Sequence, residues 1–207
     1  LNPKTRIVAV TQISNVLGIL NPVKEIVSVC HSAGCPVLID GAQGMVHEGV
    51  DVQDVDCDFY AFSGHKLYAA TGTGVLYGKR KWLDQMVPYQ GGGEMIATVR
   101  FSGTTYAPLP EKFEAGTQNI NAIPTLEPAI EMLKLMKDKE LLNAQEAVSQ
   151  YLLHALTSNP RVRLYGVPRG TETKIPLFSF SVEGAHHEDL ALILDKMGIA
   201  VRSGQMC

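Results

Sequence analysis

The sequence predicts an α/β fold built on a mostly parallel sheet, joined to part of a smaller α+β region. Two short apolar runs, residues 37–39 and 59–62, each end abruptly in small and polar residues. Buried parallel strands look this way where their carboxyl ends open into a site. Apolar residues at helical spacing between Val23 and Cys30 precede the first of these runs. This alternation of strand, helix and strand is typical of right-handed βαβ units.

The first strand is expected at Ile7–Val10, a run rich in β-branched residues that leads to Asn15. Asn21 and Pro22 then suit the N-cap and the first position of the helix that follows. Because Asn15 follows a strand, it is expected at the same edge of the sheet as the end of the next strand. An Asx turn explains this asparagine equally well.

The ends of the next two strands carry the residues with the most chemistry. Asp40 ends the first apolar run and Gln43 follows one turn later, while Ser63, His65 and Lys66 follow the second run. Ligands bind at this edge of open α/β sheets. Pyridoxal phosphate (PLP) requires a lysine amine and an acid partner for its ring nitrogen, and a hydroxyl and an imidazole can bind its phosphate. Taken singly, an ion pair or a capping aspartate beside a surface lysine explains either charged residue.

Two stretches are expected to be irregular. The acidic residues between Asp51 and Asp58 predict a solvated turn and a helix start, because their spacing does not match an EF-hand loop. Residues 88–122 are rich in glycine and proline and predict a long loop. A loop of that length inside a compact domain is usually functional or disordered.

The second half of the chain predicts helices at Leu126–Met136 and Leu141–Leu156. Strands are expected near Leu164 and at 178–182, followed by a helix at 188–197 and a last strand that starts at Ile199. We therefore divide the chain into part of a large domain, 1–125, and connecting helices with part of a small domain, 126–207. The inner stripe of the second helix is expected to consist of Leu141, Ala144, Val148, Tyr151, Leu152 and Ala155.

Composition excludes several classes of function. A net charge of −3 over 207 residues provides no basic field, so nucleic acid is not an expected partner. No apolar run is long enough to cross a bilayer. The four cysteines have neither the spacing of a zinc site nor that of a disulfide framework, so we expect no metal and a cytoplasmic location.

The motifs at the strand ends carry a family resemblance. DGAQ and SGHK, with TQISNVLG upstream and FEAGTQN and VRSGQMC downstream, resemble the group II (SUF-type) cysteine desulfurases. These enzymes belong to the class V aminotransferase-like branch of fold-type I PLP enzymes. The resemblance implies that Lys66 forms the Schiff base with PLP, that Asp40 pairs with the pyridine nitrogen, and that Gln43 meets the ring oxygen. It assigns Ser63 and His65 to the phosphate.

The same resemblance assigns four further residues. It implies that Asn15 contacts the ring oxygen and the substrate carboxylate, and that Arg202 orients that carboxylate or stabilises a thiolate. It implies that Cys207 forms the persulfide. Thr117 would reach the cofactor phosphate of a partner subunit, which makes the enzyme a homodimer.

Three positions depart from the family pattern. Gln118 stands where many relatives have proline, and Gln205 and Met206 stand where many have histidine. These departures affect the turn beside Thr117 and the surroundings of Cys207.

The implied reaction converts L-cysteine to L-alanine and leaves a persulfide for a sulfur-acceptor protein in iron–sulfur cluster assembly. A selenocysteine lyase would share almost every residue named, and a kynureninase-like hydrolase would not require Cys207. A third alternative is a catalytically inert fragment that dimerises. Relatives of this kind carry further structure at both ends, so we expect an internal fragment with weak or no activity on its own.

Overall fold

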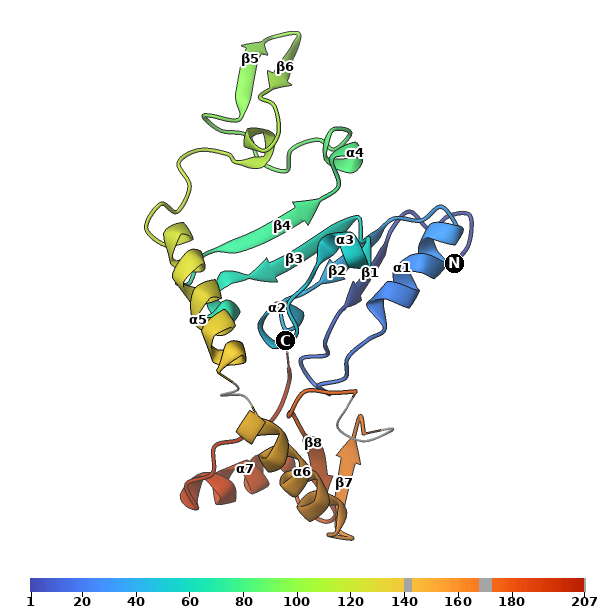
Figure 1. Ribbon diagram of the computed structural model, residues 1–207, viewed down its shortest axis with the longest axis vertical. Coiled ribbons are helices and arrows are strands. Elements are labelled where there is room, and N and C mark those ends of the chain that lie inside the picture. The colour runs from blue at the N-terminus through green and yellow to red at the C-terminus, as the bar shows by residue number, and fades with distance from the viewer. Residues whose placement is uncertain (140–142, 168–172, 207) are drawn as a thin grey trace. The chain divides into compact units, whose positions relative to one another are not determined.

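A computed structural model describes residues 1–139, 143–167 and 173–206 (Figure 1). The chain forms two compact units. The first contains Leu1–Val10 and Val23–Leu133, and the second contains Thr11–Pro22 and Lys134–Cys207. The segment that carries Asn15 thus belongs with the second unit, although it precedes most of the first in sequence.

The first unit is built on a four-stranded sheet in the order β1-β2-β3-β4 (Figure 1). Strands β2 and β3 are parallel, whereas β3 and β4 are antiparallel. Helix α1 connects β1 to its neighbour β2. This arrangement confirms the predicted α/β class. The strands are β1 (Val8–Thr11), β2 (Val37–Asp40), β3 (Phe59–Ser63) and β4 (Gly74–Gly78), and helix α1 is Val23–Ser32.

The core of this unit lies between α1 and the sheet. Val27 and Cys30 of α1 cluster with Val37 and Ile39 of β2, and all four side chains are buried. Burial of each aliphatic side chain contributes roughly 1.5–3 kcal/mol. The helical spacing in the sequence therefore identified the face of α1 that packs on the sheet, with Cys30 as a core residue.

Short helical elements connect the strands of this unit. Asp51 caps helix α3 by accepting hydrogen bonds from the backbone N–H groups of Gln53 and Asp54, which confirms the expected helix start. The elements are α2 (Gly44–His47), α3 (Val52–Val55), η1 (Gly64–Leu67), α4 (Arg80–Leu83), η2 (Glu111–Phe113), η3 (Ile123–Thr125) and α5 (Leu126–Asp138).

The prediction of a solvated acidic stretch is wrong for Asp58, which is fully buried. Its carboxylate accepts hydrogen bonds from the Val37 backbone N–H at 2.9 Å and from Trp82 Nε1 at 2.6 Å. It also lies 2.7 Å from Nε2 of His31. Burial alone would raise the pKa of Asp58, but these donors outweigh it and lower the pKa to about 2. The aspartate joins α1, β2 and α4 at the end of the sheet opposite Asp40.

The expectation of an irregular stretch at 88–122 is also wrong in part. Strands β5 (Ile96–Arg100) and β6 (Gly103–Tyr106) form an antiparallel hairpin that projects from the rest of the unit (Figure 1). Phe101 lies fully exposed at its turn. Several residues of the two strands have high β propensity. The glycines and prolines on both sides of the hairpin nevertheless made the whole stretch look like a loop in the sequence.

The second unit contains two helices and a two-stranded antiparallel sheet. The pairing between its strands runs from Val162 opposite Val182 to Tyr165 opposite Ser179. Both strands and the last helix lie where the sequence predicted them. The elements are α6 (Asn143–Thr157), β7 (Val162–Tyr165), β8 (Ser179–Val182) and α7 (His187–Lys196).

Two other expectations for this unit are wrong. Leu141 of the expected inner stripe lies outside the described residues, whereas Val148 and Tyr151 of the stripe are 64% and 76% exposed and Ser149 is buried. Helix α6 packs on β7, and that contact leaves most of the apolar stripe on the accessible side. The expected strand at Ile199 is irregular, because no described neighbour supplies a backbone ladder for it.

Candidate functional site

The residues predicted for the site divide between the two units. The first unit contains Asp40, Gln43, the segment 63–66 and Thr117, and the second contains Asn15 and Arg202. Cys207 lies outside the described residues, so its proposed role depends on the sequence.

The parallel pairing of β2 with β3 brings the first set of residues to one edge of the sheet. Asp40 pairs with Ala61, two residues before Ser63, and the backbone N–H of Gly41 donates to the Ala61 carbonyl at 2.8 Å. Asp40 is exposed, and its carboxylate accepts a hydrogen bond from the Ala42 backbone N–H at 2.9 Å. The carboxylate and the residues that follow β3 therefore share this edge, as the two sequence patterns predicted.

The backbone directly after Asp40 is fixed by a close approach. A Cβ atom on Gly41 would lie 2.0 Å from Cζ of Tyr60, so only glycine fits between β2 and this buried ring. Burial raises the pKa of the Tyr60 hydroxyl, which keeps it uncharged. The packing of Tyr60 on Gly41 thus constrains the backbone directly after Asp40.

Lys66 lies in the 3₁₀ turn η1, which begins immediately after β3. The turn is held by Gly64, whose N–H donates to the Thr73 carbonyl at 2.9 Å and whose carbonyl accepts from Ala69 at 3.1 Å. A Cβ atom on Gly64 would lie 2.2 Å from Oγ1 of Thr73. His65 is exposed and Lys66 is half-buried. A short, fixed turn therefore presents the lysine at the end of the strand.

Gln43 is brought beside the same turn. It is the residue that precedes α2, and α2 contacts η1. Its side chain makes no capping hydrogen bond to the helix. Gln43 therefore lies next to a helix that contacts the Lys66 turn.

Thr117 lies on an exposed turn that follows η2. The N–H of Gly116 donates to the Gly93 carbonyl at 3.0 Å, which ties this turn to the glycine-rich segment. The side-chain amide of Gln118 donates to the Gly116 carbonyl at 3.2 Å. This hydrogen bond closes the turn at the position where many relatives have proline.

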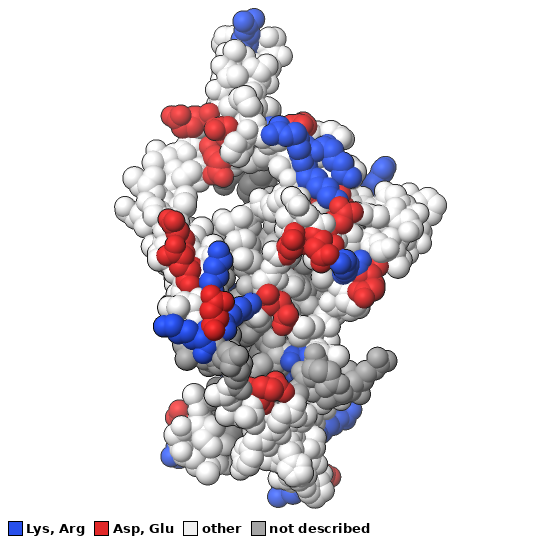
Figure 2. Space-filling model, viewed as in Figure 1, with Lys and Arg blue, Asp and Glu red and all other residues white. Residues whose placement is uncertain are grey.

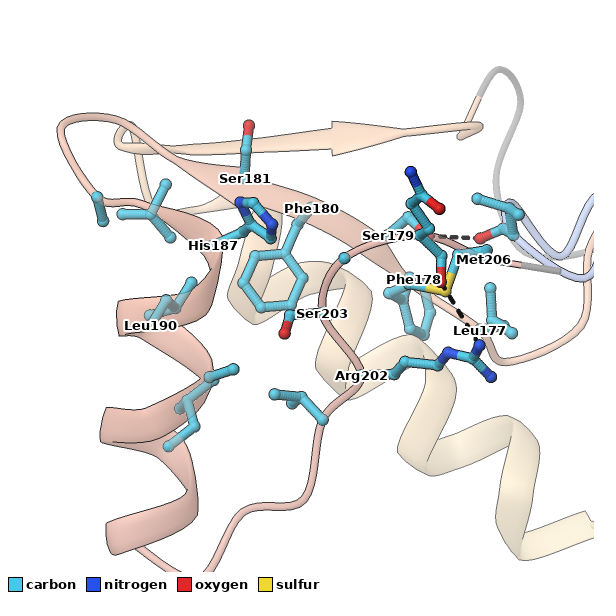
Figure 3. A pocket seen from close by; sticks show the side chains of 18 of the residues that line it. Leu177, Phe178, Ser179, Phe180, Ser181, His187, Leu190, Arg202, Ser203 and Met206 are labelled. Atoms are coloured by element: carbon cyan, nitrogen blue, oxygen red, sulfur yellow. Dashed lines mark hydrogen bonds between the residues drawn. The ribbon is translucent and has the colours of Figure 1, made fainter.

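In the second unit, Asn15 and Arg202 line one pocket of about 670 Å³ (Figure 3). Most of its lining is apolar and comes from β8, α7 and the segment after α7. The Arg202 guanidinium donates a long hydrogen bond of 3.5 Å to the Gln205 carbonyl. A pocket of this kind, with few polar groups that converge on it, suits a small molecule with one anionic group.

The first set of residues fits PLP by its chemistry. It offers one amine, one carboxylate and one amide, with a hydroxyl and an imidazole on the same short turn. Glycines at positions 41 and 64 let the backbone approach its neighbours closely at both strand ends. The described residues contain no cluster of three or more His, Cys, Asp or Glu arranged to hold a metal ion.

The surface charge is mixed on the face that can be seen (Figure 2). Basic and acidic groups are interspersed on the face shown in Figure 2, and neither sign covers it alone. No described helix has the length and apolar character needed to span a membrane.

Comparisons with known proteins agree with the fold. Residues 1–207 match the sequence model of the aminotransferase class-V family. The chain therefore belongs to the aminotransferase class-V family. Two further comparisons indicate which members it resembles.

The cysteine desulfurase of Pectobacterium atrosepticum is 45% identical over 208 residues, which cover 100% of this chain and 50% of that protein. The crystal structure of the cysteine desulfurase CsdA from Escherichia coli superimposes with a TM-score of 0.84 at 40% identity, over 98% of this chain and 49% of that one. A mutant C-DES with glycine covalently linked to its PLP cofactor superimposes with a TM-score of 0.74 at 26% identity, over 98% and 54%. The chain spans about half the length of the relatives it matches.

Sequence reasoning missed the residues that support the site. Tyr60 was recognised as part of a strand, but not as the ring that presses on Gly41. Lys174 and Ser179 were not predicted, although Lys174 stands directly before the largely apolar residues 175–178, which was a visible signal. A lysine beside apolar residues indicates either the end of a strand or a buried amine that binds particular polar groups.

Proposed function

We propose that this chain carries the cofactor site of a PLP-dependent cysteine desulfurase of group II, which converts L-cysteine to L-alanine. The supporting observation is the position of Asp40 and Lys66 at the ends of neighbouring parallel strands, on one edge of the sheet. The relatives named cysteine desulfurase add the reaction type.

When bound, PLP would supply an electron sink for the substrate Cα carbanion. The Lys66 amine would hold the cofactor at rest, and after release would remove the Cα proton and return a proton later. The Asp40 carboxylate would keep a proton on the ring nitrogen. Ser63 and His65 would bind the phosphate, and Gln43 would contact the ring oxygen.

In the second unit, Asn15 and Arg202 would hold the substrate carboxylate. The Cys207 thiolate would attack the substrate sulfur, the carbon–sulfur bond would break, and alanine would leave an enzyme persulfide behind. The persulfide would pass to a sulfur-acceptor protein for iron–sulfur cluster assembly. The three described cysteines are buried free thiols, in accord with a reducing cytoplasmic setting.

The first test is cofactor retention. We expect the purified chain, mixed with PLP and passed through gel filtration, to keep a visible absorbance band characteristic of lysine-bound PLP. Alanine release from cysteine is expected to be slower than for the full-length E. coli CsdA. A chain that is folded by circular dichroism but keeps no PLP would favour the inert dimerising fragment.

We further expect self-association, because the family resemblance places Thr117, which lies on an exposed turn, at the cofactor phosphate of a partner subunit. Its proposed role on the cofactor phosphate therefore requires a second copy of the chain. Multi-angle light scattering in the presence of PLP should give the mass of a dimer. A monomer at high concentration, with PLP bound, would contradict the assignment of Thr117.

A further inference from the structure

Two segments of the second unit, distant in sequence, are tied together by several hydrogen bonds. Residues 13–20 form a turn that carries Asn15, here called the Asn15 turn. Within it, the N–H of Gly18 donates to the Ser14 carbonyl at 2.9 Å, and the N–H of Ser14 donates to the Ile19 carbonyl at 3.0 Å. Gly18 has a left-handed φ of +70°, which favours glycine at this point.

Residues 173–179, here called the clamp segment, hold this turn from outside. The N–H of Ile175 donates to the Gly18 carbonyl at 2.8 Å. The Ser179 hydroxyl donates to the Val16 carbonyl (Figure 3). Two carbonyls that follow Asn15 are therefore held by one short segment.

Lys174 shapes the clamp segment. It is only 7% exposed, and its ammonium group donates to the carbonyls of Ile175, at 3.3 Å, and Leu177. The same nitrogen lies 4.2 Å from the centroid of the Phe178 ring. These contacts bend the segment so that Ile175 and Ser179 both face the Asn15 turn.

Burial of the Lys174 ammonium group costs free energy. Packing alone would not require a cation at this position. No carboxylate in the described residues forms a salt bridge with Lys174, and burial lowers its pKa. An apolar side chain of similar length would avoid that cost. An apolar side chain could not donate hydrogen bonds to the carbonyls of Ile175 and Leu177.

We propose that Lys174 and Ser179 are positioning residues that hold the Asn15 turn at the pocket lined by Arg202. This inference rests on the proposed function for its catalytic meaning, because Asn15 is there assigned to the substrate carboxylate. Lys174 fixes the conformation of the clamp segment. Ser179, at the end of that segment, binds the carbonyl of Val16, the residue after Asn15. The two residues act through the turn, because their side chains donate hydrogen bonds to backbone carbonyls of the clamp segment and of the Asn15 turn.

The first measurement follows the turn itself by amide hydrogen exchange in the ¹⁵N-labelled chain. In Ser179→Ala, exchange at the Ser14 and Gly18 amides should become about fivefold faster, as expected for the loss of one buried hydrogen bond. Lys174→Met, which keeps the length of the side chain, should accelerate the same amides. The matched control is Ser181→Ala on the same strand, because the Ser181 hydroxyl lies 3.1 Å from that of Tyr165 and makes no described bond to the turn. Its Ser14 and Gly18 amides should exchange at the original rate.

The second measurement follows the substrate carboxylate. In the PLP-loaded chain, L-alanine is titrated and the cofactor absorbance is recorded. Ser179→Ala should raise the half-saturating concentration of L-alanine several-fold while the bound PLP per chain stays unchanged.

The outcomes separate this inference from the proposed function. Equal exchange at Ser14 and Gly18 in all four proteins would overturn the positioning role. Faster exchange with an unchanged half-saturating concentration would also overturn it and leave a purely structural role. Absence of any response to L-alanine in the unsubstituted chain would count against the proposed function, and the exchange measurement would still decide whether the clamp segment holds the turn.

Discussion

Replacement of Lys66 by alanine is expected to abolish covalent attachment of PLP. Borohydride reduction of the unsubstituted chain with PLP should add one cofactor mass to the peptide that contains residue 66, because the reduced carbon–nitrogen bond is stable. The variant lacks the amine that the turn η1 presents at the end of β3. Intact mass spectrometry after reduction measures the result directly.

The control for this experiment is Lys24→Ala, which removes an exposed lysine of α1 paired with Asp54. It should be labelled as fully as the original chain. If Lys66→Ala still traps one cofactor at a single site, the lysine has been assigned wrongly. Circular dichroism of both variants excludes unfolding as the reason for a lost adduct.

Replacement of Asp58 by alanine is expected to have the largest effect on stability. The variant leaves the backbone N–H of Val37 and the Trp82 indole N–H without their buried acceptor, and it removes the closer of the two carboxylates beside His31. Removal of one member of such a buried set typically costs about 3–5 kcal/mol of unfolding free energy. Urea denaturation followed by tryptophan fluorescence is suited to this test, because Trp82 is the single tryptophan of the chain.

Asp54→Ala provides the matched comparison, since Asp54 forms an exposed pair with Lys24. Exposed pairs contribute only about 0–1 kcal/mol. Similar losses of unfolding free energy in Asp58→Ala and Asp54→Ala would show that the buried contacts of Asp58 contribute no more than an exposed ion pair.

The same aspartate predicts acid sensitivity. Its pKa is lowered from an ordinary 3.8 to about 2 in the folded chain, so the unfolded chain takes up its proton first as pH falls. The stability from Asp58 is therefore complete above about pH 4 and is lost as pH falls toward about 2. The original chain should lose unfolding free energy over this range more steeply than Asp58→Ala. If the unfolding free energies of the original chain and of Asp58→Ala fell in parallel over this pH range, the lowered pKa of Asp58 would be contradicted.

The sequence by itself determined where β2 and β3 of the first unit end and which residues stand there. Asp40 and Lys66 could be assigned to one edge because apolar runs that stop at polar residues show both a buried strand and its end. The face of α1 that carries Cys30 followed from helical spacing in the same way. These are local properties, and each depends on only a few consecutive residues.

Only the tertiary structure decided which polar groups are buried and what holds the site in place. Asp58 stands 27, 21 and 24 residues from its partners His31, Val37 and Trp82, and local composition made it look solvated. Ser179 bonds to a carbonyl 163 residues away. The free energy of a buried polar group depends on donors and acceptors that other elements bring to it, and a pattern read along the chain does not contain them.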